Sequence, residues 1–67
     1  MKVTRIIEKA PIIDADGKWN VFCQVFRGRS YVYGAIVCDT MKEALSIKEG
    51  QILDIEKTRF EQRIKNV

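Results

Sequence analysis

Two neighbouring apolar segments constrain the fold more than any other part of this chain, because they can form only one well-matched β-hairpin. The segments run over 18–26 and 31–38, and the loop between them centres on Gly28 and Arg29. Glycine at the first central position of a two-residue loop is typical of a type II′ turn, whose twist suits antiparallel strands. We therefore predict a hairpin with Gly28 and Arg29 at its tip.

The register set by this turn separates the two faces of the hairpin. Because paired side chains share a face, a shift of one residue would move every side chain to the other side, so the pattern specifies the register. One face is apolar or small at every position, and we expect it to face the core: Trp19, Val21, Cys23, Val25, Val32, Gly34, Ile36 and Cys38. The other face mixes aromatic, amide and small apolar residues: Asn20, Phe22, Gln24, Phe26, Tyr31, Tyr33, Ala35 and Val37.

The remaining segments read as short strands and one short helix. The β-branched stretch 2–13 favours extended structure, with Pro11 at an edge or a bulge because it cannot donate a ladder hydrogen bond. Thr40 and Glu43 have the spacing of a helix capping box, which predicts one to two helical turns. The segment 51–55 reads as a further strand.

The last stretch, 56–67, fits two readings. As a strand it places Phe60, Gln62 and Ile64 on one face. As a helix it would align Phe60, Ile64 and Val67 with Leu53, with oppositely charged pairs four residues apart. We favour the strand, which would also project Lys57, Arg59, Arg63 and Lys65 to one side.

Three strands, a short helix and two strands predict a mainly β fold. This is the element order of a small five-stranded OB-like barrel, the oligonucleotide- and oligosaccharide-binding fold. A helical C-terminus would instead give an α+β fold with a three- or four-stranded antiparallel sheet, and an SH3-like barrel is a third option. The 67 residues predict one domain, 1–67.

Composition argues against several classes of function. The chain has two cysteines, no histidine and a net charge of +3, so we expect no metal, no cofactor and no catalytic site. It also has no apolar run long enough to span a membrane and no export signal at its start. We therefore expect a cytoplasmic, non-catalytic protein that does not bind membranes.

The mixed face of the hairpin suggests a nucleic-acid-binding surface. Aromatic rings on such a face can stack on unpaired bases, and amides can read base edges. We predict binding of single-stranded DNA or RNA, since only splayed bases can stack. The predicted stacking and reading residues are Phe22, Gln24, Phe26, Tyr31 and Tyr33, and the predicted phosphate contacts are Arg27, Arg29, Arg59 and Arg63.

The same face also fits a protein-interaction module. An exposed apolar patch marks an interface without identifying the partner, and an open strand edge can pair with another chain. The alternative prediction is therefore a homo-oligomer, an inhibitor or an accessory subunit.

Overall fold

The predicted hairpin is confirmed in the computed structural model, which describes residues 1–63. Strand β3 (Trp19–Arg27) pairs with β4 (Ser30–Cys38) in the expected register, from Trp19 opposite Cys38 to Phe26 opposite Tyr31. Gly28 has a φ of 66°, whereas Arg29 stays outside the positive-φ region, as a type II′ turn requires.

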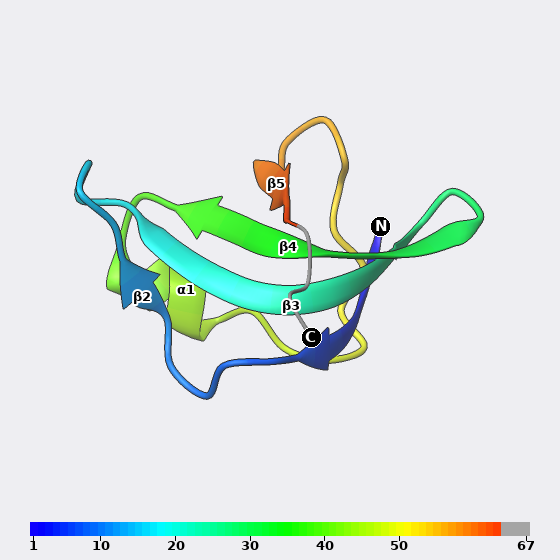
Figure 1. Ribbon diagram of the computed structural model, residues 1–67, viewed down its shortest axis with the longest axis horizontal. Coiled ribbons are helices and arrows are strands. Elements are labelled where there is room, and N and C mark those ends of the chain that lie inside the picture. The colour runs from blue at the N-terminus through cyan, green and yellow to red at the C-terminus, as the bar shows by residue number, and fades with distance from the viewer. Residues whose placement is uncertain (64–67) are drawn as a thin grey trace.

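The hairpin is the centre of a five-stranded antiparallel sheet, with order β1-β3-β4-β5 and β2 also paired to β3 (Figure 1). The flanking strands are short: β1 (Lys2–Ile6), β2 (Ile12–Ile13) and β5 (Phe60–Gln62). The figure shows β1 and β2 along one side of β3, and β5 beside β4.

The expected single extended segment 2–13 is divided in two. The register of β1 on β3 shifts between Val3 and Arg5, and both Ile7 and Glu8 donate their N–H groups to the carbonyl of Phe22. This irregular backbone interrupts the ladder, and Pro11 stands at its end, directly before β2. Pro11 thus lies at a break between two edge segments.

The core lies on the face of the hairpin that the sequence indicated. Val21, Cys23, Val25, Ile36 and Cys38 are buried there, together with two residues from outside the hairpin, Val3 and Ala44. Both cysteines are free thiols. Burial raises the pKa of the Cys23 thiol to about 11, because the low-dielectric core disfavours the thiolate.

The predicted capped helix is also confirmed, as α1 (Met41–Leu45). The Glu43 N–H donates to Thr40 Oγ1 at 3.1 Å, so Thr40 is the N-cap. Ala44 is the buried residue of this helix and anchors it on the core face near the end of β4. Among residues 1–63 no helix is long and apolar enough to cross a membrane.

The predicted strand 51–55 is reduced to a single bridge, between Lys2 and Ile52. Gln51 bonds to Val3 of β1 and Leu53 bonds to Met1, just before β1, but Asp54 then begins a turn. Its side chain accepts from the Glu56 N–H at 2.9 Å and its carbonyl accepts from the Lys57 N–H at 3.2 Å. This local bonding ends the extended segment.

The sheet therefore remains open over the described residues. The segment 50–53 lies against β1 and β5 lies against β4, and no pair in residues 1–63 joins 50–53 to β5. The described residues form a mainly β fold with a five-stranded antiparallel sheet and one short helix.

The helical reading of the last stretch is wrong for residues 56–63. Phe60, Glu61 and Gln62 pair with β4, and the residues before them form a turn and a loop. Gly34 permits this approach: a Cβ on it would lie 2.6 Å from the Phe60 ring and 3.0 Å from the Gln62 Cα. The parts of the prediction that concern Ile64, Lys65 and Val67 lie outside the described residues.

Candidate nucleic-acid interface

The face of the hairpin opposite the core, called the outer face below, grades from buried to exposed along its length. At the end near β2, Asn20 is only 4% exposed and Ala35 is fully buried. Near the turn, Phe26 is 39% exposed and Tyr31 is 66% exposed. Phe22, Gln24 and Tyr33 are half-buried between them. The predicted stacking residues are therefore accessible chiefly towards the turn.

We call the exposed end the hairpin half of the outer face. Its residues are Lys2, Arg5, Gln24, Phe26, Arg29, Tyr31 and Tyr33. The Phe26 and Tyr31 rings form a tilted pair, with centroids 5.1 Å apart and planes at 59°. Gln24 pairs with Tyr33 on the adjoining positions, so the amide lies beside the phenol.

The first strand adds two cations to this half. Lys2 lies directly opposite Phe26 and Arg5 opposite Gln24, and directly paired residues share a face of a sheet. Thr4 fixes the strand against β3, since its hydroxyl lies 2.9 Å from the carbonyl oxygen and 3.2 Å from the amide oxygen of Gln24. No carboxylate in residues 1–63 forms an ion pair with these two cations or with Arg29.

The two arginines near the hairpin tip lie differently. Arg29 is an exposed residue of the turn. Arg27 pairs with Ser30 on the core side of the sheet, where its guanidinium lies 5.9 Å from the centre of the Phe60 ring. This distance is within the range of a cation–π contact. Arg27 therefore lies on the opposite side of the sheet from the outer face, whereas Arg29 is exposed at the tip of the hairpin.

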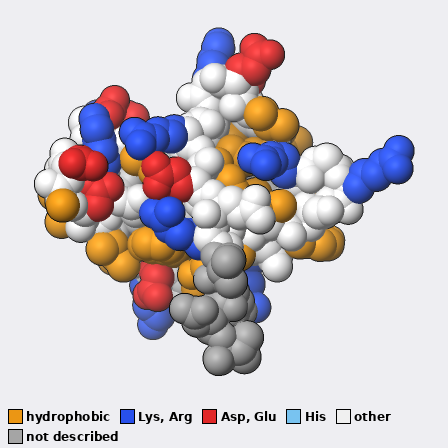
Figure 2. All heavy atoms as spheres, turned by 45° about the horizontal axis from the view of Figure 1, so that its top comes forward, with side chains coloured by type: hydrophobic (Ala, Val, Ile, Leu, Met, Phe, Trp, Pro, Cys, Tyr) orange, Lys and Arg blue, Asp and Glu red, His pale blue; other side chains and the backbone are white. Residues whose placement is uncertain are grey.

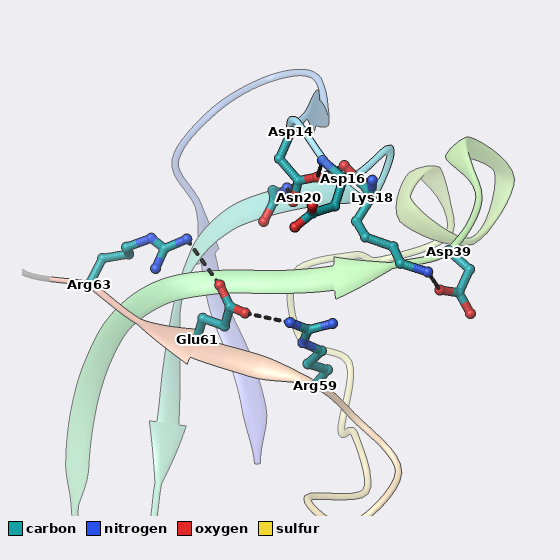
Figure 3. A network of polar contacts seen from close by, with 8 residues as sticks. All are labelled: Asp14, Asp16, Lys18, Asn20, Asp39, Arg59, Glu61 and Arg63. Atoms are coloured by element: carbon teal, nitrogen blue, oxygen red, sulfur yellow. Dashed lines mark hydrogen bonds and ion pairs between the residues drawn. The ribbon is translucent and has the colours of Figure 1, made fainter.

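The opposite end, called the network half below, is covered by polar contacts. Figure 3 shows its eight residues: Asp14, Asp16, Lys18, Asn20, Asp39, Arg59, Glu61 and Arg63. Asp14 accepts from the N–H groups of Asp16 and Lys18, at 2.9 and 3.0 Å, and from the Asn20 amide at 3.0 Å. These bonds hold the pKa of Asp14 below its usual range, with the largest effect from Asn20.

Two of the predicted phosphate contacts belong to this network. Arg59 donates to one carboxylate oxygen of Glu61 at 3.0 Å, and Arg63 donates to the other at 3.1 Å. Lys18 and Asp39 form a further pair at 2.6 Å, which lowers the pKa of Asp39 and raises that of Lys18. The basic groups at this end are thus already engaged by carboxylates.

The contrast is visible over the surface in Figure 2. Acidic and basic side chains are interleaved on the left of the view, whereas basic and hydrophobic side chains stand together towards the right-hand end. The turn between β3 and β4 lies at that same end in Figure 1. The ion pairs within residues 1–63 all lie in the network half.

The sequence alone did not place Lys2 and Arg5 on this face. Strict alternation from Val3 would have put Arg5 on the core side, and the register shift between them moves it to the outer face. Val3 and Ile6 both pack on the core although they are three residues apart, and side chains of a regular strand share a face only at even spacings. This odd spacing was the available signal of a bulge.

A hollow of about 230 Å³ lies elsewhere, between α1, the end of β4 and the 53–59 segment. Cys38 lines it, but burial and the nearby carboxylates of Glu43 and Asp39 raise the pKa of that thiol. The thiolate is disfavoured there, so this environment does not activate a nucleophile.

Comparisons with known proteins give no match: no family model, no curated protein and no solved structure corresponds to this chain.

Proposed function

We propose that this protein binds single-stranded nucleic acid, DNA or RNA, through the hairpin half of its outer face. The observation that carries the proposal is the exposed Phe26–Tyr31 pair, flanked by cations that form no ion pair within residues 1–63. Exposed rings provide stacking and free cations provide phosphate contacts, and this combination is typical of proteins that bind single strands.

The roles of the residues follow from their positions. Phe26, Tyr31 and Tyr33 stack on bases, and the Gln24 amide is within reach of a base edge beside Tyr33. Phosphates are held by Lys2, Arg5 and Arg29. Because Glu61 engages Arg59 and Arg63, we assign these two a smaller part in binding than the sequence suggested.

An OB-like arrangement is part of the same proposal. Counted as one interrupted strand, β1 and β2 precede β3 and β4, so the hairpin supplies the second and third strands. The helix and the segment 50–53 follow, and that segment lies beside β1. OB folds are partly open barrels that bind oligonucleotides on the face of strands two and three, and this correspondence supports the choice of site.

The test is fluorescence anisotropy of labelled single-stranded DNA and RNA, titrated with the protein between about 50 and about 200 mM salt. We expect saturable binding that weakens steeply with salt, and weaker binding of a duplex of the same sequence. Tyr31→Ala should weaken binding at every salt concentration by about 1–3 kcal/mol, the usual value of one stacked base. Tyr33→Ala should act in the same direction.

Arg29→Ala should behave differently, since it removes a phosphate contact. Its main effect should be a shallower dependence of affinity on salt. Unchanged affinity in both Tyr31→Ala and Arg29→Ala would rule out this surface.

A protein-interaction role is the second candidate, favoured by Ile52, which is 78% exposed. The bonds of its bridge to Lys2 are made by Gln51 and Leu53, so its own N–H and carbonyl point away from β1. Such an edge can accept a strand from another chain. A dimer that persists at high salt and dissociates on Ile52→Lys substitution would favour this role.

A further inference from the structure

The charge on the outer face sets a limit on how much of a strand can lie on it. The network half carries four acidic groups, Asp14, Asp16, Asp39 and Glu61, against three basic ones. Asp39 is exposed at the surface and Glu61 is partly so. A phosphodiester backbone that ran over this half would meet carboxylates rather than free cations, and like charges repel.

The accessible platform is correspondingly short. On the outer face it has two cross-strand pairs, Gln24 opposite Tyr33 and Phe26 opposite Tyr31, because the pair between them faces the core. At about 3.3 Å per residue these positions cover roughly 7 Å along the strands, and β1, β3 and β4 together cover roughly 10 Å across them. This area accommodates about two or three base rings, fewer than the roughly 4–16 nucleotides that an OB fold commonly occupies.

We infer that the ligand is a short unpaired run of about three nucleotides, such as a loop or a strand end, and that the network half stops a longer strand from tracking across the sheet. This inference rests on the proposed function. It assigns the ligand's class by size: a locally unpaired element, rather than a long single strand that many copies of the protein coat.

The experiment is an affinity series with oligothymidylates and oligouridylates of increasing length at low salt. Affinity should rise with length up to about three or four nucleotides. Beyond that length it should rise only by the statistical factor that a longer strand offers more equivalent binding positions. A stem closed by a four-nucleotide loop and the same stem with a three-nucleotide overhang distinguish a loop from an end. Affinity that keeps rising up to twelve nucleotides would overturn the short footprint while leaving the proposed function intact.

A charge variant tests the cause of the limit. Glu61→Gln removes the carboxylate that holds Arg59 and Arg63, so we expect it to strengthen binding of an eight-nucleotide strand several-fold, and that of a trinucleotide much less. Glu56→Gln, on the turn that follows Asp54, changes the net charge equally and is the matched control. Equal gains in both variants, or equal gains at both lengths, would contradict the inference. Absence of binding at every length would overturn the proposed function itself.

Discussion

The two halves of the outer face are built on the same two strands, yet they differ in what their polar groups do. In the network half, the Asn20 amide bonds to Asp14, Ile12 and Lys18, and the basic side chains are held by carboxylates. In the hairpin half, rings are exposed and the cations form no ion pair within residues 1–63. One end therefore satisfies its charged groups internally, whereas the basic groups of the other end form no ion pair within residues 1–63.

The neighbouring elements cause this difference. The network half is covered by the 14–18 turn on one side and by β5 on the other, and both bring charged side chains. The hairpin half has β1 along one edge, and on the other edge only Arg63, among the described residues, reaches it, through an N–H bond to the Tyr33 carbonyl. A single hairpin thus combines an end with a dense polar network and an end with exposed rings.

The most damaging change should be Gly34→Ala, at the point where β5 packs on β4. The new methyl group would collide with the Phe60 ring, with Gln62 and with the carbonyl of Glu61, part of which is backbone that cannot rotate away. We expect a loss of about 3 kcal/mol in the free energy of unfolding, since overpacking of this kind costs about 1–3 kcal/mol and occasionally more. Urea denaturation measures it.

Gly17→Ala is the matched control for that change. Gly17 has a φ of 78°, but a Cβ there would meet no atom within 4 Å. Its cost should be about 1 kcal/mol, from backbone conformation alone. If Gly34→Ala proves no more destabilising than Gly17→Ala, then β5 does not pack on β4 as described, and the network half loses its structural basis.

A pair of substitutions on β3 should separate stability from binding. Asn20→Ala removes a buried amide that donates to three acceptors, and we expect it to cost about 2 kcal/mol of stability. Gln24→Ala, four residues along the same strand face, should change stability by only about 0.5 kcal/mol but weaken oligonucleotide binding. Parallel denaturation and anisotropy measurements decide it. If Asn20→Ala mainly weakened binding and Gln24→Ala mainly reduced stability, the two halves would not have the separate roles proposed for them.

The hairpin was predictable because several local signals agreed. The turn glycine, the length of the loop and the apolar alternation all specify one register, and the structure has that register at every pair. The helix cap at Thr40 was equally local. In contrast, the extent of the 51–55 strand depended on competition between a ladder and the turn that Asp54 nucleates, which alternation alone does not reveal.

The candidate site was predictable only in part, for the same reason. The aromatic residues follow from the hairpin register, so their shared face could be derived. The positions of Arg5 and Arg27 depended on how other strands meet the hairpin: a register shift brings Arg5 to the outer face, and pairing with Ser30 takes Arg27 away from it. The pairing of Arg59 and Arg63 with Glu61 is local, because alternation along a strand places positions 59, 61 and 63 on one face, so the sequence did contain its signal.

Comparing Arg29→Ala with Arg59→Ala sharpens the assignment of phosphate contacts. Both variants lower the net charge by one, but Arg29 is an exposed residue of the turn, whereas Arg59 is paired with Glu61. For single strands, loss of one phosphate contact should reduce the salt slope by about 0.7. We expect this reduction for Arg29→Ala and little change for Arg59→Ala. Equal slopes in the two variants would mean that charge acts at long range and not through the hairpin half.

The smallest predicted effect is a loss of folding stability at acid pH, with no accompanying change in binding. The folded-state pKa of Asp14 lies below its ordinary value of 3.8, mainly because of the Asn20 hydrogen bond, and that of Asp39 is lowered by Lys18. A carboxyl whose pKa falls on folding adds stability above its unfolded pKa and loses it as pH falls through the folded one. Stability should therefore decline below about pH 4.

Asp14→Asn tests this assignment, because an amide oxygen can still accept from the backbone of the turn while the titrating group is gone. Thermal unfolding of this variant should depend less steeply on pH below about pH 4 than that of the parent protein. Oligonucleotide affinity at about pH 7 should be the same in the parent protein and in Asp14→Asn, because Asp14 lies in the network half. A difference in affinity between the two proteins would show that a carboxylate of the network half acts on the hairpin half, and that the two halves are not independent.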